Sequence, residues 1–209
     1  AGLVHVPINF SLKGAELQYL LAQSGARVAL VDPHLAEHVL AVQAETAVTQ
    51  VIPLHGADGS LLDSELDAHV ELPQIDESAL VPLLSTSGTT SDPNGVLLPL
   101  YRIPANVHAI VEHLHLSDGD VAFSWLPWSH DMGLIGMVLA PLAGNAVVTR
   151  GALHVAKPEH FVADPGLWMR RCAEVGASIT AGPDFAMRVA VRAARRSFEG
   201  SLERLRCVI

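Results

Sequence analysis

Short apolar runs alternate with longer segments of helical spacing along nearly the whole chain of 209 residues. Residues 28–31, for example, have the length of a buried strand and follow a segment in which Leu17, Leu20 and Leu21 share one helical face. This alternation is typical of repeated strand–helix units, in which each helix returns the chain to start a parallel strand. The chain is therefore predicted to have an α/β fold, with a mostly parallel, doubly wound sheet and helices on both faces.

The same pattern places the individual elements. Apolar runs predict strands over residues 4–9, 28–31, 51–54, 80–85, 95–98, 121–126, 146–149, 178–181 and 205–209. Besides the segment around Leu17, which ends at Ser24-Gly25, helical spacing predicts helices over residues 35–44, 105–114, 132–142, 165–176 and 184–197. Residues 56–78 are acidic and contain turn residues, so they are predicted to form a surface connection.

The composition describes a chain with a large core and little charge. Half of the residues are hydrophobic (50%), which excludes a disordered chain. Charged residues make up 17%, against about 25% in typical domains. The chain also begins at Ala1 and ends inside an apolar run. These features predict a fragment of a larger protein, and they predict that the isolated chain self-associates through uncovered apolar faces and strand edges.

Charge is distributed unevenly along the chain. The net charge of −9 argues against a nucleic-acid partner. Residues 1–149 carry three basic and 16 acidic side chains, whereas residues 150–209 carry ten basic and six acidic ones. Four of the basic residues lie at helical spacing on one face of the last predicted helix: Arg188, Arg192, Arg195 and Arg196. That face is either solvated or a docking site for a partner that carries phosphate groups.

The sequence predicts a soluble, cytoplasmic protein without a transmembrane segment. Cys172 and Cys207 have no framework spacing, which suits a reducing compartment, and there is no signal peptide. The longest uncharged run, residues 132–149, contains Pro141 and Gly144 and is shorter than the about 20 residues that a membrane-spanning helix needs.

Residues 85–95 form a turn between two predicted strands and concentrate hydroxyl and glycine residues (Ser-Thr-Ser-Gly-Thr-Thr-Ser-Asp-Pro-Asn-Gly). Small residues expose backbone N–H groups, and hydroxyls add further donors, which suits a polyphosphate ligand. The segment is no Walker A loop, because no Gly-Lys-Ser/Thr closes it. An ordinary polar hairpin loop is the alternative interpretation.

Residues 125–134 (Trp-Leu-Pro-Trp-Ser-His-Asp-Met-Gly-Leu) follow a predicted strand and open a helix. Open α/β sheets place their ligands at such carboxyl ends of strands. His130 is therefore a candidate site residue. The alternative is that Asp131 only caps the helix and that His130 is a hydrogen-bonded core residue.

These two segments resemble the adenylate-forming superfamily of acyl-CoA synthetases, peptide-synthetase adenylation domains and luciferases. Residues 85–95 are similar to its phosphate-binding signature, and residues 130–133 resemble a segment of its fatty acyl-AMP ligase branch. Two more stretches match in the family's order: residues 6–9 with 15–17 and 24–26, and Ala181-Gly182-Pro183-Asp184-Phe185-Ala186. The resemblance covers nearly the whole chain and implies part of the large N-terminal domain of an adenylating enzyme.

The resemblance also implies a reaction. A fatty acid and ATP form a fatty acyl-adenylate and pyrophosphate, and the acyl group then passes to the thiol of CoA or of an acyl carrier protein. Preorganised donors and Mg²⁺ stabilise the charge on the phosphate oxygens. The residues implied to hold ATP are Thr86, Ser87, Gly88, Thr89, Thr90, Asn94 and Gly95. Those implied to line the acyl site are His130, which lies near the reacting carboxylate, Met132, Gly133, Pro183 and Phe185.

Two positions depart from the family pattern, and several segments lie outside the chain. The family usually has Gly and Lys where this chain has Ser91 and Asn94. The Glu that holds Mg²⁺, the Asp that holds ribose and the C-terminal domain with its catalytic Lys are expected downstream. The resemblance therefore divides residues 1–209 of a partial adenylation domain into a phosphate-loop region (approximately 1–120) and an acyl-site region (approximately 121–209), and it implies that the isolated chain is inactive.

Alternative functions and weaker motifs remain. A degenerate homologue that only binds nucleotide or a partner is one alternative, and an enzyme that adenylates aryl or amino acids is another. His34-x-x-Glu37-His38 matches a zinc pattern of metallopeptidases without an obvious third ligand, so no metal site is predicted in the chain. Asp184 is predicted to be the N-cap of its helix.

Overall fold

The computed structural model describes residues 3–56, 74–76, 78–85, 94–147 and 151–209. The chain divides into two compact units, Ala1–Leu100 and Tyr101–Ile209. Three sheets are present among the described residues: β1 with β2, β3 with β4, and the four-stranded sheet β6-β5-β7-β8. All of their strand pairs are parallel except β3–β4, which confirms the mostly parallel α/β class.

The first unit begins with α1 (Gly14–Ser24), which packs Leu17 and Leu21 into a small core. Gly25 ends this helix with a φ of 63°, a left-handed conformation that glycine adopts without strain. The parallel strands β1 (Val28–Val31) and β2 (Gln50–Pro53) are joined by the helical turns η1 (Pro33–Leu35), α2 (Ala36–Leu40) and η2 (Gln43–Glu45).

Two predictions for this unit were wrong. The single helix expected over residues 35–44 is broken, because α2 ends at Leu40 and a turn separates it from η2. Val39 in α2 and Val42 in that turn both reach the core. The strand expected over residues 4–9 is reduced to one bridge at His5. Leu3 and Val4 are exposed, and an apolar run becomes a strand only where a neighbouring strand supplies hydrogen bonds along it.

The hairpin of β3 (Leu80–Ser85) and β4 (Gly95–Pro99) confirms two predicted strands. The strands are antiparallel, with an irregularity between Leu80 and Leu83, and the register pairs Ser85 with Gly95. The pairing thus closes the ladder at the two ends of the Ser/Thr/Gly-rich segment, whose residues 86–93 lie outside the described part of the chain.

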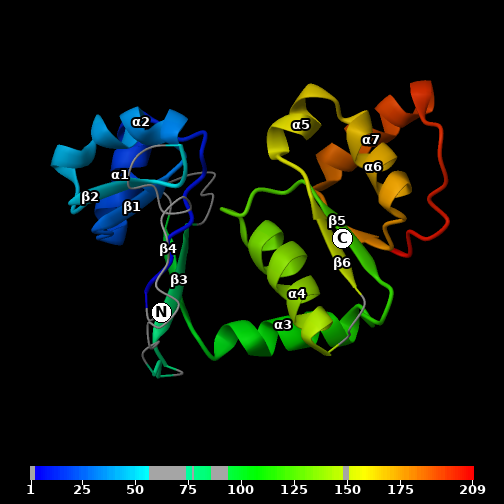
Figure 1. The fold of residues 1–209 in the computed structure, drawn as a ribbon, viewed down its shortest axis with the longest axis horizontal. Coiled ribbons are helices and arrows are strands. Elements are labelled where there is room, and N and C mark those ends of the chain that lie inside the picture. Colours follow the sequence, from blue (N-terminus) through cyan, green and yellow to red (C-terminus); the bar gives the residue numbers. More distant parts are fainter. Residues whose placement is uncertain (1–2, 57–73, 77, 86–93, 148–150) are drawn as a thin grey trace. The chain divides into compact units, whose positions relative to one another are not determined.

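The second unit contains the four-stranded sheet. Figure 1 shows α3 and α4 on one side of this sheet and α6 and α7 on the other, as expected for a doubly wound arrangement. Its elements are α3 (Arg102–His113), β5 (Val121–Ser124), a π-type helix over Met132–Leu139, α4 (Ala140–Val147), β6 (Ala152–Val155), α5 (Pro158–Ala163), α6 (Gly166–Val175), β7 (Ile179–Thr180), α7 (Asp184–Ser197) and β8 (Cys207–Val208).

The strand predicted over residues 146–149 was also wrong. Ala146 and Val147 belong to α4, residues 148–150 lie outside the described part, and the strand that pairs with β5 is β6, further along. The helix continues through Gly144-Asn145, although these residues usually end helices, because α4 packs against α3 and tertiary packing overrides local propensity. Among the described residues, no helix is long and apolar enough to cross a membrane.

An aromatic cluster fills the core of this unit. Trp125 stacks on Phe161 with ring centroids 3.9 Å apart, and Trp168 meets both rings edge-on. Cys172 is buried in the same cluster, and burial raises the pKa of its thiol to about 11. This thiol is therefore protonated at neutral pH and inert.

Candidate functional site

The strand order of the four-stranded sheet defines a point at which the chain changes direction. From β5 the chain passes through helices to its neighbour β6, and it then returns across the sheet to β7 on the other side of β5. The segments that follow β5 and β7 therefore diverge at the carboxyl edge. Open α/β sheets bind ligands at this switch point. The two segments singled out in the sequence, around His130 and around Phe185, follow these two strands.

His130 lies in the turn after β5, and its side chain is 57% exposed. Its Nδ1 lies 2.6 Å from Oδ1 of Asp131 and accepts the backbone N–H of Met132 at 3.3 Å. Both contacts are made by Nδ1, so the other ring nitrogen, Nε2, is the one left to face a ligand. His130 is thus an oriented surface histidine, and the alternative of a core residue was wrong.

Asp131 caps the π-type helix, since its Oδ1 accepts the backbone N–H of Met132 at 2.7 Å. Two residues later, Gly133 packs against the carbonyl of Pro127: a Cβ at this glycine would lie 2.2 Å from that oxygen. Only glycine allows the helix to approach the loop after β5 so closely. The lack of a side chain at Gly133 therefore allows the close packing at this edge. Met132, the preceding residue, is partly buried against the core.

The segment after β7 is held down on the aromatic cluster. A Cβ at Gly182 would lie 2.4 Å from the ring of Trp168, and the backbone N–H of Gly182 donates to the carbonyl of Ile209 at 2.8 Å. Pro183 then leads into α7, where Phe185 is 64% exposed. Asp184 is the first helical residue and accepts a hydrogen bond from Arg188 at 2.7 Å, so its prediction as an N-cap was wrong.

Sequence reasoning missed the residues that support this edge. Trp168 donates from Nε1 to Thr180 Oγ1 at 2.8 Å, and Thr180 donates in turn to the carbonyl of Phe123 at 2.8 Å, which ties α6, β7 and β5 together. Trp125 follows β5 directly, and its buried Nε1–H has no hydrogen-bond acceptor in the part of the chain that the structure describes. No signal links these residues in the sequence, because they lie far apart along it.

The opposite edge of the same sheet carries a charged cluster. Asp120, just before β5, accepts hydrogen bonds from Arg206 Nη2 at 2.7 Å and Nε at 3.1 Å and from Ser178 Oγ at 2.7 Å. Burial raises the pKa of Asp120, but the hydrogen bonds from Arg206 and Ser178 outweigh this effect and leave the pKa at about 2. Arg206 also donates to the carbonyls of Leu114 and His115 at the end of α3.

The residues predicted to hold ATP belong to the first unit. Thr86, Ser87, Gly88, Thr89 and Thr90 lie outside the described residues, as does Ser91. Asn94 and Gly95 are exposed at the start of β4, where the hairpin ladder begins. The structure therefore confirms the paired strands on either side of the phosphate-loop candidate, while the loop itself stays a prediction.

Within the described residues, no group of three or more His, Cys, Asp and Glu side chains is arranged to hold a metal ion. In the zinc-like pattern of the sequence, His34 instead bonds the side chain of Asp32, and His55 lies 3.6 Å from the same carboxylate. Burial raises the pKa of Asp32, but the hydrogen bonds from His34 outweigh it, so the pKa lies below its ordinary value.

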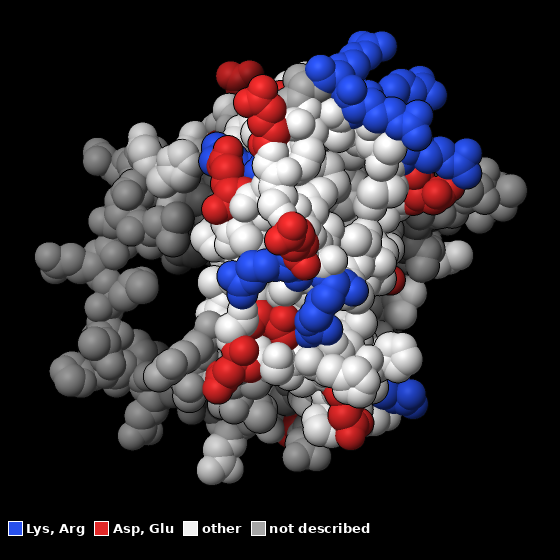
Figure 2. Space-filling view, turned by 90° about the vertical axis from the view of Figure 1, so that its right-hand side faces the viewer, with Lys and Arg blue, Asp and Glu red and all other residues white. Residues whose placement is uncertain are grey.

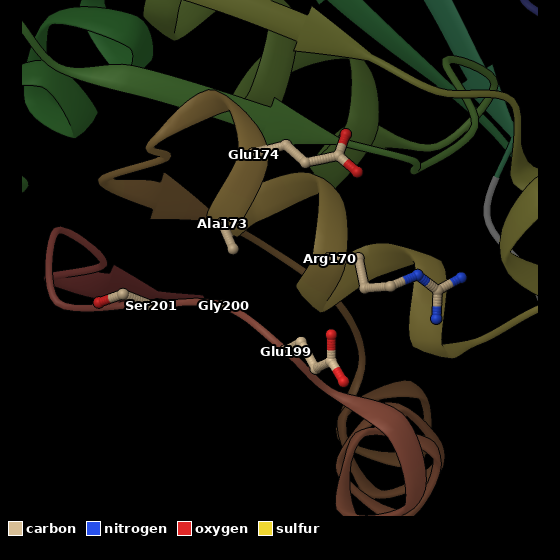
Figure 3. Close-up of a pocket in the computed structure, with 6 residues that line it drawn as sticks. All are labelled: Arg170, Ala173, Glu174, Glu199, Gly200 and Ser201. Carbon is tan, nitrogen blue, oxygen red and sulfur yellow. The ribbon is translucent and has the colours of Figure 1, made fainter.

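An open cavity of about 280 Å³ lies between α6 and the segment after α7. Figure 3 shows Arg170, Ala173 and Glu174 on the helix and Glu199, Gly200 and Ser201 on the segment facing it. Arg170 is paired with Asp164, and Glu174 with Arg171. This segment leads into β8, so the cavity is separate from the carboxyl edge, and its charged groups on α6 are already neutralised.

Known proteins resemble the chain over nearly all of its length. A long-chain-fatty-acid–AMP ligase of Mycobacterium marinum is 34% identical over 145 residues, which are 67% of this chain and 22% of that protein. A long-chain-fatty-acid–AMP ligase of Mycobacterium tuberculosis is 29% identical over 89% of this chain and 32% of its own length. The crystal structure of a fatty acyl-adenylate ligase from Legionella pneumophila, in complex with acyl adenylate and pyrophosphate, superimposes with a TM-score of 0.78 at 25% identity, covering 98% of this chain and 35% of that one.

The chain thus spans between about a fifth and about a third of the length of these relatives. The sequence model of one family, described as AMP-binding enzyme, matches residues 1–209, the entire chain. The match agrees with the α/β fold and with the order of the segments that resembled adenylate-forming enzymes. The chain belongs to the family of AMP-binding enzymes.

Proposed function

We propose that the protein containing this chain activates fatty acids with ATP and forms fatty acyl-adenylates. The switch point in the four-stranded sheet is the main support for this proposal. Two segments, around His130 and Phe185, resemble the acyl site of fatty acyl-AMP ligases, and they follow adjacent parallel strands at the same edge of the sheet. Their positions are 55 residues apart in the sequence, so a common edge is a property of the fold. The names of the relatives, fatty-acid–AMP ligases, support the same reaction.

In this proposal a carboxylate oxygen of the fatty acid attacks the α-phosphorus of ATP, and pyrophosphate leaves. His130, held by Asp131, presents Nε2 to the reacting carboxylate. Phe185 and the neighbouring Pro183 form a wall of the acyl site together with Met132, and Gly133 keeps the helix close to the loop after β5. Exposed apolar residues such as Trp128, which is 51% exposed in the same turn, support a site for an aliphatic chain.

ATP is proposed to bind the segment from Thr86 to Gly95 in the phosphate-loop region, approximately residues 1–120, while approximately residues 121–209 supply the acyl site. Mg²⁺ would be held by a Glu downstream of Ile209. The acyl group would then pass to the thiol of CoA or of an acyl carrier protein, with AMP as the leaving group. We place the protein in the cytoplasm and expect the isolated chain to self-associate.

The proposal is tested by binding of a fatty acyl sulfamoyl-adenosine, a stable analogue whose sulfamate replaces the phosphate. We expect the full-length protein that contains this chain to bind the analogue in calorimetry, and its His130→Ala variant to bind about tenfold more weakly, since a hydrogen bond to a charged group is lost. His108→Ala, an exposed histidine on α3, is the matched control and retains binding. Equal loss in both variants, or no binding by the full-length wild-type protein, would overturn the proposal.

The alternatives predict different selectivity. A degenerate nucleotide-binding homologue would bind sulfamoyl-adenosine with or without the acyl chain equally well, and an aryl or amino acid enzyme would prefer the corresponding analogue. We also expect the isolated chain to show no carboxylate-dependent exchange of labelled pyrophosphate into ATP. Exchange clearly above a control without carboxylate would show that the catalytic groups lie within residues 1–209.

A further inference from the structure

The solvent-facing side of α7 concentrates positive charge. Its four arginines are all exposed, and in the sequence of this helix Asp184 is the only acidic residue. Arg188 pairs with Asp184, whereas within the described residues no ion pair involves the other three, Arg192, Arg195 and Arg196. Figure 2 shows blue side chains gathered at the top of one face of the molecule, where α7 runs, while basic and acidic groups are mixed lower on that face.

The same side of α7 also exposes apolar groups. At about 100° per residue, the arginines, Phe185, Val189 and Val191 fall within less than half of the helix circumference. Val189 and Val191 are each 41% exposed. Ala186 and Ala190, on the opposite side, are completely buried against the core. Arginine is enriched in protein–protein interfaces, and a partner that covers this face would also remove the exposed valines from water.

The spacing of the charges identifies the shape of the partner. Arg188 and Arg196 are eight residues apart, about 12 Å along the helix axis. Carboxylates at the same spacing on another helix would meet the whole row of guanidinium groups, whereas the clustered phosphates of one nucleotide would leave part of the row unpaired. The helix also begins at the carboxyl edge, where Pro183 precedes its first turn and Phe185 lies in that turn. A partner that lies along α7 therefore has one end beside the candidate acyl site.

We infer that this face of α7 docks an acidic helix of the protein that carries the acceptor thiol. The inference rests on the proposed function for the identity of the acceptor, and on the exposed arginines for the docking surface itself. The acidic helix would pair with Arg192, Arg195 and Arg196 and cover Val189 and Val191. A partner held there can deliver its thiol to an acyl-adenylate at the adjoining edge of the sheet.

The test uses a fluorescent alanine-rich helical peptide whose glutamates lie on one face at the spacing i, i+4, i+7 and i+8. A second peptide of equal composition has its glutamates distributed around the helix. We expect the chain to bind the first peptide more tightly in fluorescence anisotropy. Raising the ionic strength from about 0.1 M to about 1 M, which shortens the Debye length from about 10 Å to about 3 Å, should abolish this binding.

Charge reversal locates the surface. Arg192→Glu and Arg195→Glu should each weaken peptide binding by roughly three- to tenfold, whereas Lys157→Glu, an exposed cation at the start of α5, should change it less than about twofold. All of these side chains are exposed, so circular dichroism is expected to show unchanged folds. Equal binding by the wild-type chain and the two arginine variants, or equal affinity for both peptides, would overturn the docking surface.

Two further outcomes reject the proposed partner. Displacement of the peptide by CoA would make the face a nucleotide-phosphate site, and a dimer in sedimentation that Arg192→Glu dissociates would make the occupant a second copy of this chain. Binding of the acyl sulfamoyl-adenosine is measured in the same variants and is expected to be unchanged. If the full-length wild-type protein does not bind the analogue, the proposed function is refuted, but the evidence that α7 binds the acidic peptide is unaffected.

Discussion

The two edges of the four-stranded sheet are built from different kinds of residues. At the amino edge, Asp120, Ser178 and Arg206 precede three of the strands and satisfy one another with hydrogen bonds. At the carboxyl edge, the segments after β5 and β7 expose His130 and Phe185 and depend on glycines at close contacts. The charged edge ties the strands to one another, whereas the other edge leaves His130 and Phe185 exposed. In the proposed function, the sheet thus separates stability from ligand binding by edge.

The largest effect is expected from crowding the carboxyl edge. Gly133→Ala places a Cβ against the carbonyl of Pro127 and should lower the free energy of unfolding by about 3 kcal/mol, as overpacking of a core does. Gly136→Ala, in the same helix, meets nothing within 4 Å. That control should be neutral or stabilising by up to about 1 kcal/mol, because alanine favours helices over glycine. Urea denaturation of both variants checks this, and similar effects of the two would contradict the close contact.

Breaking the amino edge should have the next largest effect. Arg206→Ala leaves the carboxylate of Asp120, whose side chain is 15% exposed, without its cation and should lower the free energy of unfolding by about 2 to 3 kcal/mol. Arg171→Ala, which removes an exposed i,i+3 pair with Glu174, should lower it by less than about 0.5 kcal/mol. Comparable losses in the two variants would mean that the Asp120 cluster is no stronger than a surface pair.

The pH dependence of stability should report the same cluster. The pKa of Asp120 falls from 3.8 to about 2 on folding, so its contribution is fully present above pH 4 and is lost as the pH falls from about 4 to about 2. The lost contribution is on the order of 2 kcal/mol. Asp120→Asn should flatten the pH profile of the unfolding free energy in this range. A variant profile parallel to that of the wild-type chain would contradict the shift.

A smaller effect should distinguish the two buried tryptophans. Trp168→Phe removes the hydrogen bond to Thr180 and should cost about 1 to 2 kcal/mol. Trp125→Phe removes an N–H that has no acceptor among the described residues and keeps the stacking on Phe161. It should therefore be neutral or stabilising by up to about 1 kcal/mol. Thermal unfolding of the two variants checks the sign, and a larger loss for Trp125→Phe would contradict it.

The smallest effect on stability should come from His130 itself. The side chain is exposed, so His130→Ala is expected to change the free energy of unfolding by less than about 0.5 kcal/mol. The same variant should bind the acyl-adenylate analogue more weakly, as proposed above. A large loss of stability in denaturant titrations would show that His130 supports the fold, and the contrast between the two edges would fail.

The sequence by itself determined the fold class and the position of most elements in the second half of the chain. Helix α7 occupies Asp184–Ser197, the predicted residues, because its amphipathic pattern is long and uninterrupted. The hairpin strands β3 and β4 and the placement of His130 after a strand were also predictable, since turn residues and strand-length apolar runs mark them locally. The family membership agrees with motifs read from the same residues.

Only the tertiary structure decided which of these local possibilities became real. Residues 4–9 have the apolar character of a strand but form only a bridge at His5, because a strand needs a pairing partner. Ala146 and Val147, the described part of the apolar run 146–149, belong to α4, which packs against α3. The glycine contacts at Gly133 and Gly182, the aromatic cluster and the strand order all join residues distant in sequence. Local pattern carries no record of such contacts, since they arise from the packing of elements against one another.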